Sequence, residues 1–472
     1  MAAARRTLVD FVLLSGGESL GKVAGFVAFA YLARTLSTEG YGAVELAAGF
    51  AVFFSLMVDF GLGTMGARET ARSPESAREH AVWIPSARLL LAIIGVPAMT
   101  VAPLLMGQPW ETVQLVGLFS LSLLFFIFDQ RWLFQGLERM RVVASAQLIR
   151  MTVFAATVLL VVHHEQDVLR VGMAEAGAAA VMAGYFLFHQ RRARIPIGLA
   201  WPKEPLRHLF REASSVGLGQ MIWAFNQQTP TFLIATFWAS TQLAWFGSAN
   251  RIYVSLSTFS MVYHFNLFPT FARLLRESKE AYFETVQASL RLSAWGGTLV
   301  ALGLTVTAEA TCALVFGEDF RAAGRPLAIM IWGLPLTLVS GHARWSLVAA
   351  GQQRYVLFAQ IIGAVATAIL GGALIPTWGV EGAALTNVGA TLVVWGVAQR
   401  HAQREIGAIP FLSVVVKPAL GVAAGLGVAR FVPNPWLGGI AAGVACGAVA
   451  LLVDRALLGD LKRLAGARRG VT

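Results

Sequence analysis

The chain has 472 residues, of which 56% are hydrophobic and only 13% are charged. Because ordinary soluble domains carry roughly a quarter charged residues, this composition excludes a soluble globular protein and favours one embedded in lipid. The formal net charge of +11 does not indicate nucleic-acid binding, since the basic residues are not gathered into one patch with interleaved aromatic side chains.

Taken in chain order, apolar runs between charged or Pro- and Gly-rich breaks predict fourteen transmembrane helices. The first six are expected over residues 8–33, 43–63, 80–106, 112–134, 142–162 and 168–189. A polar interval from His189 to about Phe210 follows, rich in Arg and Pro, and is predicted to link two halves. The other eight are expected over residues 210–237, 242–272, 285–315, 326–350, 355–375, 381–400, 412–431 and 436–456.

These spans predict an all-α polytopic membrane protein with two pseudo-symmetric six-helix lobes and two further helices. The expected domains are an N-lobe over residues 1–190, a cytoplasmic linker over 191–209, a C-lobe over 210–402, and two helices with a basic cytoplasmic tail over 403–472. The last two helices carry little charge and are expected to lie away from any transport path.

Lys and Arg residues fall mostly on one side of the predicted spans. With the N-terminus in the cytoplasm, 28 of the 37 lie inside, five lie outside and four lie within spans. This asymmetry follows the positive-inside rule and predicts that both termini are cytoplasmic. The basic start resembles a signal peptide without a small-residue cleavage site, so the first helix is expected to be an uncleaved signal anchor.

The two halves share a weak internal repeat. An aromatic-Gly pair at Tyr41-Gly42 recurs at Phe246-Gly247, displaced by 205 residues. At the same offset Lys22 matches Gln227, Glu45 matches Asn250, and Asp59 matches His264. Six spans separate equivalent positions, so the halves are expected to be parallel repeats around a central cavity. The alternative is chance similarity among low-complexity apolar helices.

Two glycine-rich strings fit nucleotide-binding spacings in the wrong context. Gly16–Lys22 fits the phosphate-loop spacing, but Val23 replaces the magnesium-binding hydroxyl and no strand precedes it. Gly61–Gly66 fits the dinucleotide fingerprint, but it ends a membrane span. The loops show no nucleophile or metal-ligand constellation, so the sequence predicts no catalytic residue, no metal, no cofactor and no enzymatic activity. Cys312 and Cys446 lie in apolar spans and are expected to be buried packing residues.

Ionisable and amide side chains at membrane depth are the informative residues, since each costs about 2.5 to 3.5 kcal/mol to insert when charged. Glu18 and Lys22 lie one turn apart in the first span. One interpretation is a self-neutralising pair that lets the helix insert. The other is that Lys22 offers a cation to an anionic substrate while Glu18 tunes that cation or carries a coupling proton.

The seventh and eighth spans carry the other candidates for a substrate cavity. Amides beside an aromatic ring suit sugar hydroxyls, and a cation without an acidic neighbour one turn away suits phosphate. The alternative is that such polar residues join helices through interhelical hydrogen bonds. The candidates are Gln220, Trp223, Asn226 and Gln227 in the seventh span, and Asn250, Arg251 and His264 in the eighth.

A second group is expected to serve coupling or structure: Glu45, Asp59, Arg88, Arg150 and Glu175. Glu45 is a possible structural partner of Arg251, and Asp59 is expected to cap the cytoplasmic end of its span. Arg88, Arg150 and Glu175 lie near span ends, where long side chains reach the interface easily.

Small residues four apart in the last two spans predict close contacts between helices. The pairs are Gly421 with Gly425, Gly439 with Gly443, and Gly443 with Gly447.

Several strings along the whole chain resemble the polysaccharide transporter family, the Wzx-type O-antigen flippases of the multidrug/oligosaccharidyl-lipid/polysaccharide exporter superfamily. They are Ala33–Gly42, Asp59–Gly63, Ala67–Arg72, Leu206–Ala213, Phe316–Phe320 with Ala322 and Ala323, and Leu347–Gln353. Ser37-Thr38 stands where such proteins often have Gly-Pro, which is a minor departure.

This resemblance implies a flippase that moves an undecaprenyl-diphosphate-linked oligosaccharide to the periplasmic leaflet of the bacterial inner membrane by alternating access. Its expected partners are the lipid-linked oligosaccharide, membrane lipid, and a polysaccharide polymerase with chain-length machinery, but no nucleic acid; a monomer is favoured. On this interpretation Lys22 and Arg251 contact the diphosphate. The residues expected to contact sugars are Gln220, Trp223, Asn226, Gln227 and His264.

Four other functions remain open at this point. A lipid II flippase and a multidrug antiporter belong to the same superfamily, although the antiporter would need a pocket lined with carboxylates. A membrane glycosyltransferase or polymerase would need a large catalytic loop, which the spacing of the spans does not provide. A structural scaffold would not need Lys22 and Arg251 within spans.

Overall fold

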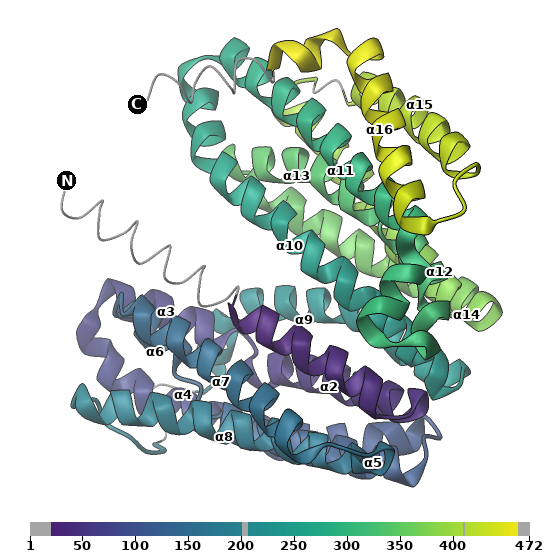
Figure 1. Cartoon of the computed structure of the whole chain (residues 1–472). Helices are drawn as coiled ribbons and strands as arrows, with labels where there is room; N and C mark the ends of the chain where they lie inside the picture. The colour runs from purple at the N-terminus through teal and green to yellow at the C-terminus, as the bar shows by residue number, and fades with distance from the viewer. Residues whose placement is uncertain (1–19, 201–205, 409–410, 461–472) are drawn as a thin grey trace. The chain divides into compact units, whose positions relative to one another are not determined.

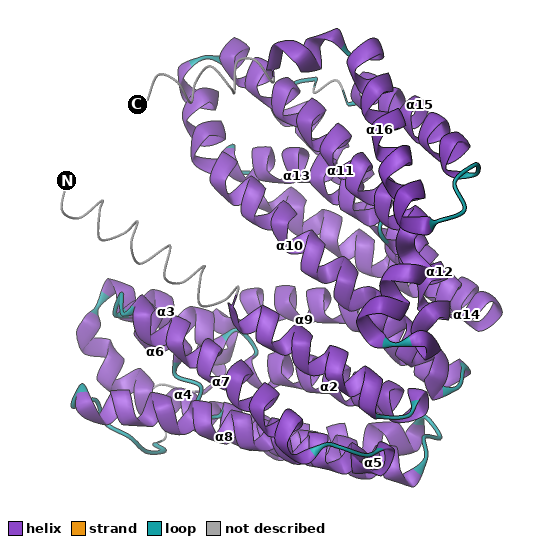
Figure 2. Ribbon diagram, viewed as in Figure 1, coloured by secondary structure: helices purple, strands orange, loops and turns teal. Residues whose placement is uncertain are grey.

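The structure is a computed structural model of the whole chain, and it describes residues 20–200, 206–408 and 411–460. All regular elements in these ranges are helices (Figures 1 and 2), which confirms the predicted all-α polytopic fold class. Within the same ranges, nine helical segments are long and apolar enough to cross a bilayer. The chain is therefore a multi-pass membrane protein.

The chain divides into two compact units, Met1–Ala244 and Trp245–Thr472. We call them unit 1 and unit 2. In unit 1, residues 20–35 are helical, and they are followed by α2 (Thr38–Asp59), α3 (Leu62–Arg72), η1 (Pro74–Ser76), α4 (Ala77–Leu105), α5 (Trp110–Phe126), α6 (Arg131–Gly136), α7 (Met140–Val161), η2 (Glu165–Asp167), α8 (Val168–Arg192) and α9 (Leu206–Phe237).

Helix α10 (Ser240–Glu277) begins just before the division and continues into unit 2. The other elements of unit 2 are α11 (Lys279–Phe316), η3 (Glu318–Ala323), α12 (Gly324–Met330), α13 (Gly333–Ala349), α14 (Gln353–Glu405), α15 (Leu412–Ala429) and α16 (Pro435–Val453). Most of these helices coincide with the predicted spans to within a few residues, but α5 ends eight residues before the predicted span 112–134 does, and the predicted span 326–350 is divided into α12 and α13. The short helices α3 and α6 follow polar sequence and were not predicted as helices.

Helix α14 contains two of the predicted spans. Its backbone leaves helical geometry at Gly379, with φ 54° and ψ −127°. The ring of Tyr355 near its start stacks on His401 near its end, with 4.2 Å between centroids. The two parts therefore fold back on each other as an antiparallel hairpin, with the turn in the predicted gap.

Side-chain caps fix where several helices begin. Ser37 accepts a hydrogen bond from the Gly40 amide at 3.1 Å at the start of α2. Asn434 accepts from the amides of Trp436 and Leu437 at 2.9 and 3.1 Å at the start of α16. Each cap satisfies amides that have no partner within the helix.

Helix α9 packs on α2 within unit 1 through glycines that allow close backbone approach. A Cβ atom at Gly217 would lie 2.5 Å from the Phe60 carbonyl oxygen, and one at Gly42 would lie 2.1 Å from the Ser240 carbonyl oxygen. Between these contacts, the rings of Phe50 and Phe232 stack with 4.7 Å between centroids. The contact of Gly217 and the stacked rings therefore hold the seventh predicted span against the second, whereas Ser240 is the first residue of α10.

Helices α15 and α16 pack on α11. A Cβ atom at Gly421 would lie 2.7 Å from the Cys446 sulfur, and one at Gly439 would lie 2.8 Å from a Thr307 methyl group. At Gly425 a Cβ atom would meet the Ala442 carbonyl oxygen at 2.8 Å. These three glycines are close contacts, as predicted.

The same prediction was wrong for Gly443 and Gly447, where a Cβ atom would meet nothing within 4 Å. Both are half-buried on α16 and make no close contact with another helix. Cys312 and Cys446 are buried with free thiols, which confirms their prediction as packing residues.

Candidate functional site

A buried ion pair lies where α2 ends. Asp59 is the last residue of α2, and the following turn uses left-handed backbone at Phe60 (φ 40°) and Gly61 (φ 80°). The turn directs the Asp59 carboxylate toward α4, where Arg88 donates to Oδ1 from Nη2 at 2.5 Å and from Nε at 3.2 Å. The Arg88 side chain is only 3% exposed, so it does not reach the interface as expected from its place in the sequence.

Helix α3 completes the Asp59 environment. The Gly63 amide donates to Asp59 Oδ1 at 3.1 Å, so the carboxylate caps the start of α3. A Cβ atom at Gly63 would lie 2.9 Å from Asp59 Oδ1 and 3.0 Å from Arg88 Nη2. Only glycine leaves room for the pair here, which explains one glycine of the false dinucleotide fingerprint.

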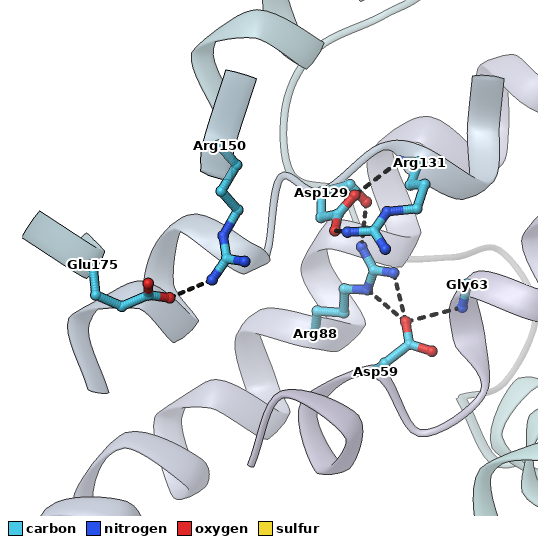
Figure 3. A network of polar contacts seen from close by, with 7 residues as sticks. All are labelled: Asp59, Gly63, Arg88, Asp129, Arg131, Arg150 and Glu175. Carbon is cyan, nitrogen blue, oxygen red and sulfur yellow. Dashed lines mark hydrogen bonds and ion pairs between the residues drawn. The ribbon is translucent and has the colours of Figure 1, made fainter. Parts of the chain in front are cut away.

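The network continues to the segment after α5 (Figure 3). Arg88 Nη1 donates to the Asp129 carbonyl oxygen at 2.7 Å, and the Arg88 guanidinium lies over the Phe126 ring at 5.1 Å. The Asp129 carboxylate accepts from the Arg131 amide and from Arg131 Nη2, both at 3.0 Å. Two carboxylates and two guanidiniums thus join α2, α3, α4 and α6 without net charge.

A second ion pair joins α7 and α8. Arg150 Nη2 donates to Glu175 Oε1, and the two side chains are 23% and 12% exposed. In Figure 3 no dashed line joins this pair to the first network. Asp59, Arg88, Arg150 and Glu175, all expected to serve coupling or structure, thus each have a partner on another helix. Glu45, the fifth residue of that group, is half-buried on α2.

The predicted cavity residues of the first helix are only partly described. Glu18 lies outside the described residues. Gly21 packs on α7, where a Cβ atom would lie 3.6 Å from the Gln147 carbonyl oxygen. Lys22, the next residue, is exposed and does not share that packing face.

Four cavity candidates lie on α9, in unit 1. Trp223 is 49% exposed, and Gln227 is exposed one turn later. Gln220 and Asn226 are half-buried, and the buried Gln220 Oε1 accepts no hydrogen bond from the described residues. One side of α9 therefore exposes aromatic and amide side chains, and its other side packs on α2.

The α10 candidates occupy two different environments. Asn250 and Arg251 are half-buried near the start of α10. His264 is 1% exposed, and its ring is enclosed by α10 and α13 inside unit 2. We expected His264 to contact sugars, but in this state its ring reaches no open surface.

Sequence reasoning missed a group of polar residues around His264. His342 on α13 is also 1% exposed and lies beside His264, with 4.9 Å between ring centroids. A buried histidine within a predicted span was the available signal. Its partners could not be read from the sequence, because they lie 53 and 78 residues away.

Two pockets in the described part of the chain lie away from these candidates. One of about 450 Å³ is bordered by Leu160, His163 and Arg170 at the turn between α7 and α8. Another of about 410 Å³ is bordered by Glu309 and Arg325 near the end of α11. In that same part of the chain, no three His, Cys, Asp or Glu side chains are grouped to hold a metal ion.

The sequence of residues 8–275 matches the polysaccharide biosynthesis protein family, a segment that contains α2 to α9 and most of α10. The match covers more than half of the chain. The chain belongs to this family. Both Lys22 and Arg251 lie inside the matched segment.

A similar protein and a similar solved structure agree with this family assignment. A protein of Shigella dysenteriae assigned as an O-antigen transporter is 21% identical over 357 residues, which cover 72% of this chain and 86% of the relative. Among solved structures, the lipid II flippase MurJ in an inward closed conformation matches with a TM-score of 0.73 and 14% identity, over 95% of this chain and 100% of MurJ.

An inward-facing multidrug resistance transporter of the MATE family matches with a TM-score of 0.63 and 16% identity, over 85% of this chain and 98% of the transporter. At these identities the likeness to MurJ and to the MATE transporter shows a shared fold. This family member therefore has the fold of the MOP exporters.

Proposed function

We propose that the chain is a flippase that moves an undecaprenyl-diphosphate-linked oligosaccharide from the cytoplasmic to the periplasmic leaflet of the bacterial inner membrane. The family membership carries this proposal, because a multi-pass protein of polysaccharide biosynthesis with an exporter fold acts on a lipid-anchored saccharide. The O-antigen assignment of the Shigella relative supports the same substrate class. Both termini are cytoplasmic in this proposal, as the Lys and Arg asymmetry predicts.

The substrate's two parts require different surroundings. The diphosphate is anionic and needs cations in a water-accessible space, while the polyprenyl tail remains in lipid. In the proposal Lys22 and Arg251 bind the diphosphate. The exposed amide and aromatic side of α9, with Trp223 and Gln227, binds sugar hydroxyls. The chain acts as a monomer that transports without catalysis and delivers its product to a polymerase with chain-length machinery.

The double substitution Lys22→Gln and Arg251→Gln tests the diphosphate site. Polymer export in a strain that depends on the chain is expected to be lost, while the amount of protein in the membrane stays normal. Arg430→Gln is the matched control, because Arg430 is an exposed cation in the turn between α15 and α16. Normal export by the double variant would refute the role of these cations.

The fold likeness to MurJ makes lipid II the second candidate substrate. Reconstitution in liposomes separates the two, with lipid II and undecaprenyl-diphosphate-linked oligosaccharide offered to the same preparation. Faster transport of the oligosaccharide is expected. A monophosphate-linked sugar in a third preparation tests whether the second phosphate is needed, and equal transport of all three lipids would contradict the proposed specificity.

A further inference from the structure

A closed chain of hydrogen bonds joins α10, α11 and α13 inside unit 2. We define the histidine cluster as Tyr263, His264, Ser289 and His342. Tyr263 Oη lies 2.6 Å from Ser289 Oγ, and Ser289 Oγ lies 2.7 Å from His342 Nε2. His342 Nδ1 lies 3.4 Å from His264 Nε2. No part of the proposed substrate site uses this cluster.

The hydrogen-bond partners determine where the protons are. His264 Nδ1 lies 2.7 Å from the Ser260 carbonyl oxygen, and His342 Nδ1 lies 2.9 Å from the Leu338 carbonyl oxygen. Carbonyl oxygens only accept, so both Nδ1 atoms carry hydrogen. The Ser289 hydroxyl then donates to His342 Nε2 and accepts from Tyr263. With both imidazoles neutral, every strong contact of the cluster is satisfied.

One nitrogen in the cluster has a lone pair without a close donor. Among the residues that the structure describes, His264 Nε2 faces only the His342 Nδ1 hydrogen, at 3.4 Å, and that hydrogen is already shared with the Leu338 carbonyl oxygen. An additional proton therefore binds at His264 Nε2. Once bound, it faces the Nδ1 hydrogen of His342, and two donors repel each other.

The surroundings of the pair add to this repulsion. Arg344, the charged side chain of α13, lies two residues after His342 and is a cation. In the described part of the chain, the neighbouring titratable groups include Tyr263 on α10 and Tyr282 on α11, whose hydroxyl donates to Ser346 at 2.5 Å. Helix α14 contributes apolar residues to the neighbouring core, among them Ala359, Val394 and Ala398. Neither the tyrosines nor these apolar residues supply a negative charge for an imidazolium.

The His264 ring also fills the contact between α10 and α13. A Cβ atom at Gly341 would lie 2.3 Å from His264 Cε1, so α13 touches the ring at a residue that has no side chain. Separation of α10 from α13 would expose the ring to water and relieve the repulsion. Protonation of His264 and closure of this contact therefore exclude each other.

We propose that His264, positioned by His342, is the site that binds one proton in each transport cycle. The proton adds to His264 Nε2 from water on one side of the membrane when α10 and α13 separate, and it is released to water on the other side as they close. Coupling follows from this alternation, because a ligand that binds only one conformation drives the equilibrium between them. The inference rests on the proposed flippase function for its role, but the proton site itself can be tested without substrate.

The first experiment uses the purified protein alone. Hydrogen–deuterium exchange of α10 and α13 is measured at about pH 5.5 and about pH 7.5, the range over which histidine changes charge. Beyond the intrinsic effect of pH on exchange, acid is expected to lower the protection of both helices. The double variant His264→Gln and His342→Gln is expected to lose this response, and His401→Gln is expected to retain it.

His401 is a matched control because it lies in unit 2 and stacks on Tyr355 outside the cluster. Unchanged protection of α10 and α13 in acid would overturn the proposal. So would an acid response that persists in the double variant, because the response would then come from other groups. Should the double variant not fold, the conservative His342→Asn with His264 intact is used, and it is expected to shift the acid response to a different pH.

The second experiment uses liposomes with undecaprenyl-diphosphate-linked N-acetylglucosamine and an internal pH-sensitive dye. In the wild type, a pH gradient is expected to accelerate transport and transport is expected to move protons. The double variant is expected to transport without either effect. Transport without proton movement in the wild type would overturn the coupling, whereas absence of any transport would contradict the flippase function and leave the exchange experiment to decide the proton site.

Discussion

The two units hold buried polar groups in different ways. In unit 1, Arg88 and Asp59 are fully charged partners that lie 2.5 Å apart at the junction of three helices. In unit 2, His264 and His342 lie in a core joined by neutral hydrogen bonds, with an arginine rather than a carboxylate nearby. Both arrangements cross between helices that are far apart in the sequence.

The difference separates a permanent contact from one that responds to conditions. Guanidiniums and carboxylates ordinarily do not change charge near neutral pH, so an ion pair of this kind is not expected to respond to pH there. Imidazoles change charge near neutral pH, so the histidine cluster holds only while it remains neutral. Unit 1 therefore contains a fixed clamp, by which we mean the ion pair of Asp59 and Arg88. In our proposal, the contact of unit 2 that opens is the one between α10 and α13 at the histidine cluster.

The largest expected effect comes from breaking the fixed clamp. Arg88→Gln leaves the buried Asp59 carboxylate without its cation, and such a change costs about 3 to 5 kcal/mol of stability. We expect a large drop in the thermal unfolding temperature of the protein in detergent. The double variant Asp59→Asn with Arg88→Gln removes both charges and is expected to recover much of the loss.

Arg131→Gln is the control for that experiment. Arg131 belongs to the same network, but its side chain is 43% exposed, so its loss should be small. Equal destabilisation by Arg88→Gln and Arg131→Gln would mean that the burial of Arg88 and Asp59 does not determine how much stability is lost.

The second prediction compares the two units by overpacking their glycines. Gly63→Ala inserts a methyl group 3.0 Å from Arg88 Nη2, and Gly341→Ala inserts one 2.3 Å from the His264 ring. Each is expected to cost about 1 to 3 kcal/mol, because neither site has room for a methyl group. Gly177→Ala on α8 is the control, since nothing lies within 4 Å, and it should be neutral or stabilising.

The glycine variants should differ in their response to pH. Gly341→Ala prevents close approach of α13 to His264, so its α10 and α13 amides should be poorly protected at every pH. Gly63→Ala should leave the acid response of unit 2 unchanged. A normal acid response in Gly341→Ala would contradict the link between this contact and the histidine cluster.

The third prediction concerns the end of the hydrogen-bond chain. Tyr263→Phe removes the donor to Ser289 but leaves the Ser289 hydroxyl bonded to His342. The expected cost is about 0.5 to 1.5 kcal/mol, the net value of one hydrogen bond. Thermal unfolding in detergent measures it, with Tyr355→Phe as the comparison outside the cluster. A loss of stability as large as that of Arg88→Gln would show that Tyr263 does more than donate one hydrogen bond to Ser289.

The sequence predicts the helices of this protein far better than their contacts. The gap between the predicted spans 355–375 and 381–400 contains the turn at Gly379, because apolar runs and their breaks are local properties. Helical spacing also predicts that Glu18 and Lys22 lie one turn apart, and Glu18 lies outside the described residues. Helical spacing could not pair Asp59 with Arg88, which lie 29 residues apart on different helices.

The candidate site shows the same limit. His264 was recognised as a polar residue within a span, but a helical face does not tell a cavity wall from a helix contact. The contact with His342 shows that His264 lies at a helix contact. This contact depends on the packing of α13 against α10, which the sequence does not give. The exposed positions of Trp223 and Gln227 agree with a cavity role but do not test it.

The smallest expected effect comes from the second ion pair of unit 1. Both pairs consist of an arginine and a carboxylate, so the comparison between them tests burial alone. Arg150 and Glu175 form the same kind of pair as Arg88 and Asp59, but their side chains are 23% and 12% exposed. The pair is less deeply buried than Arg88 and Asp59, so Arg150→Gln is expected to cost less, about 1 kcal/mol. Glu175→Gln should cost about the same, and the double variant little more than either, because each single change already removes the interaction. Additive losses in this double-mutant cycle would show that the residues do not interact, and a cost as large as that of Arg88→Gln would show that burial is not what makes the clamp of unit 1 strong.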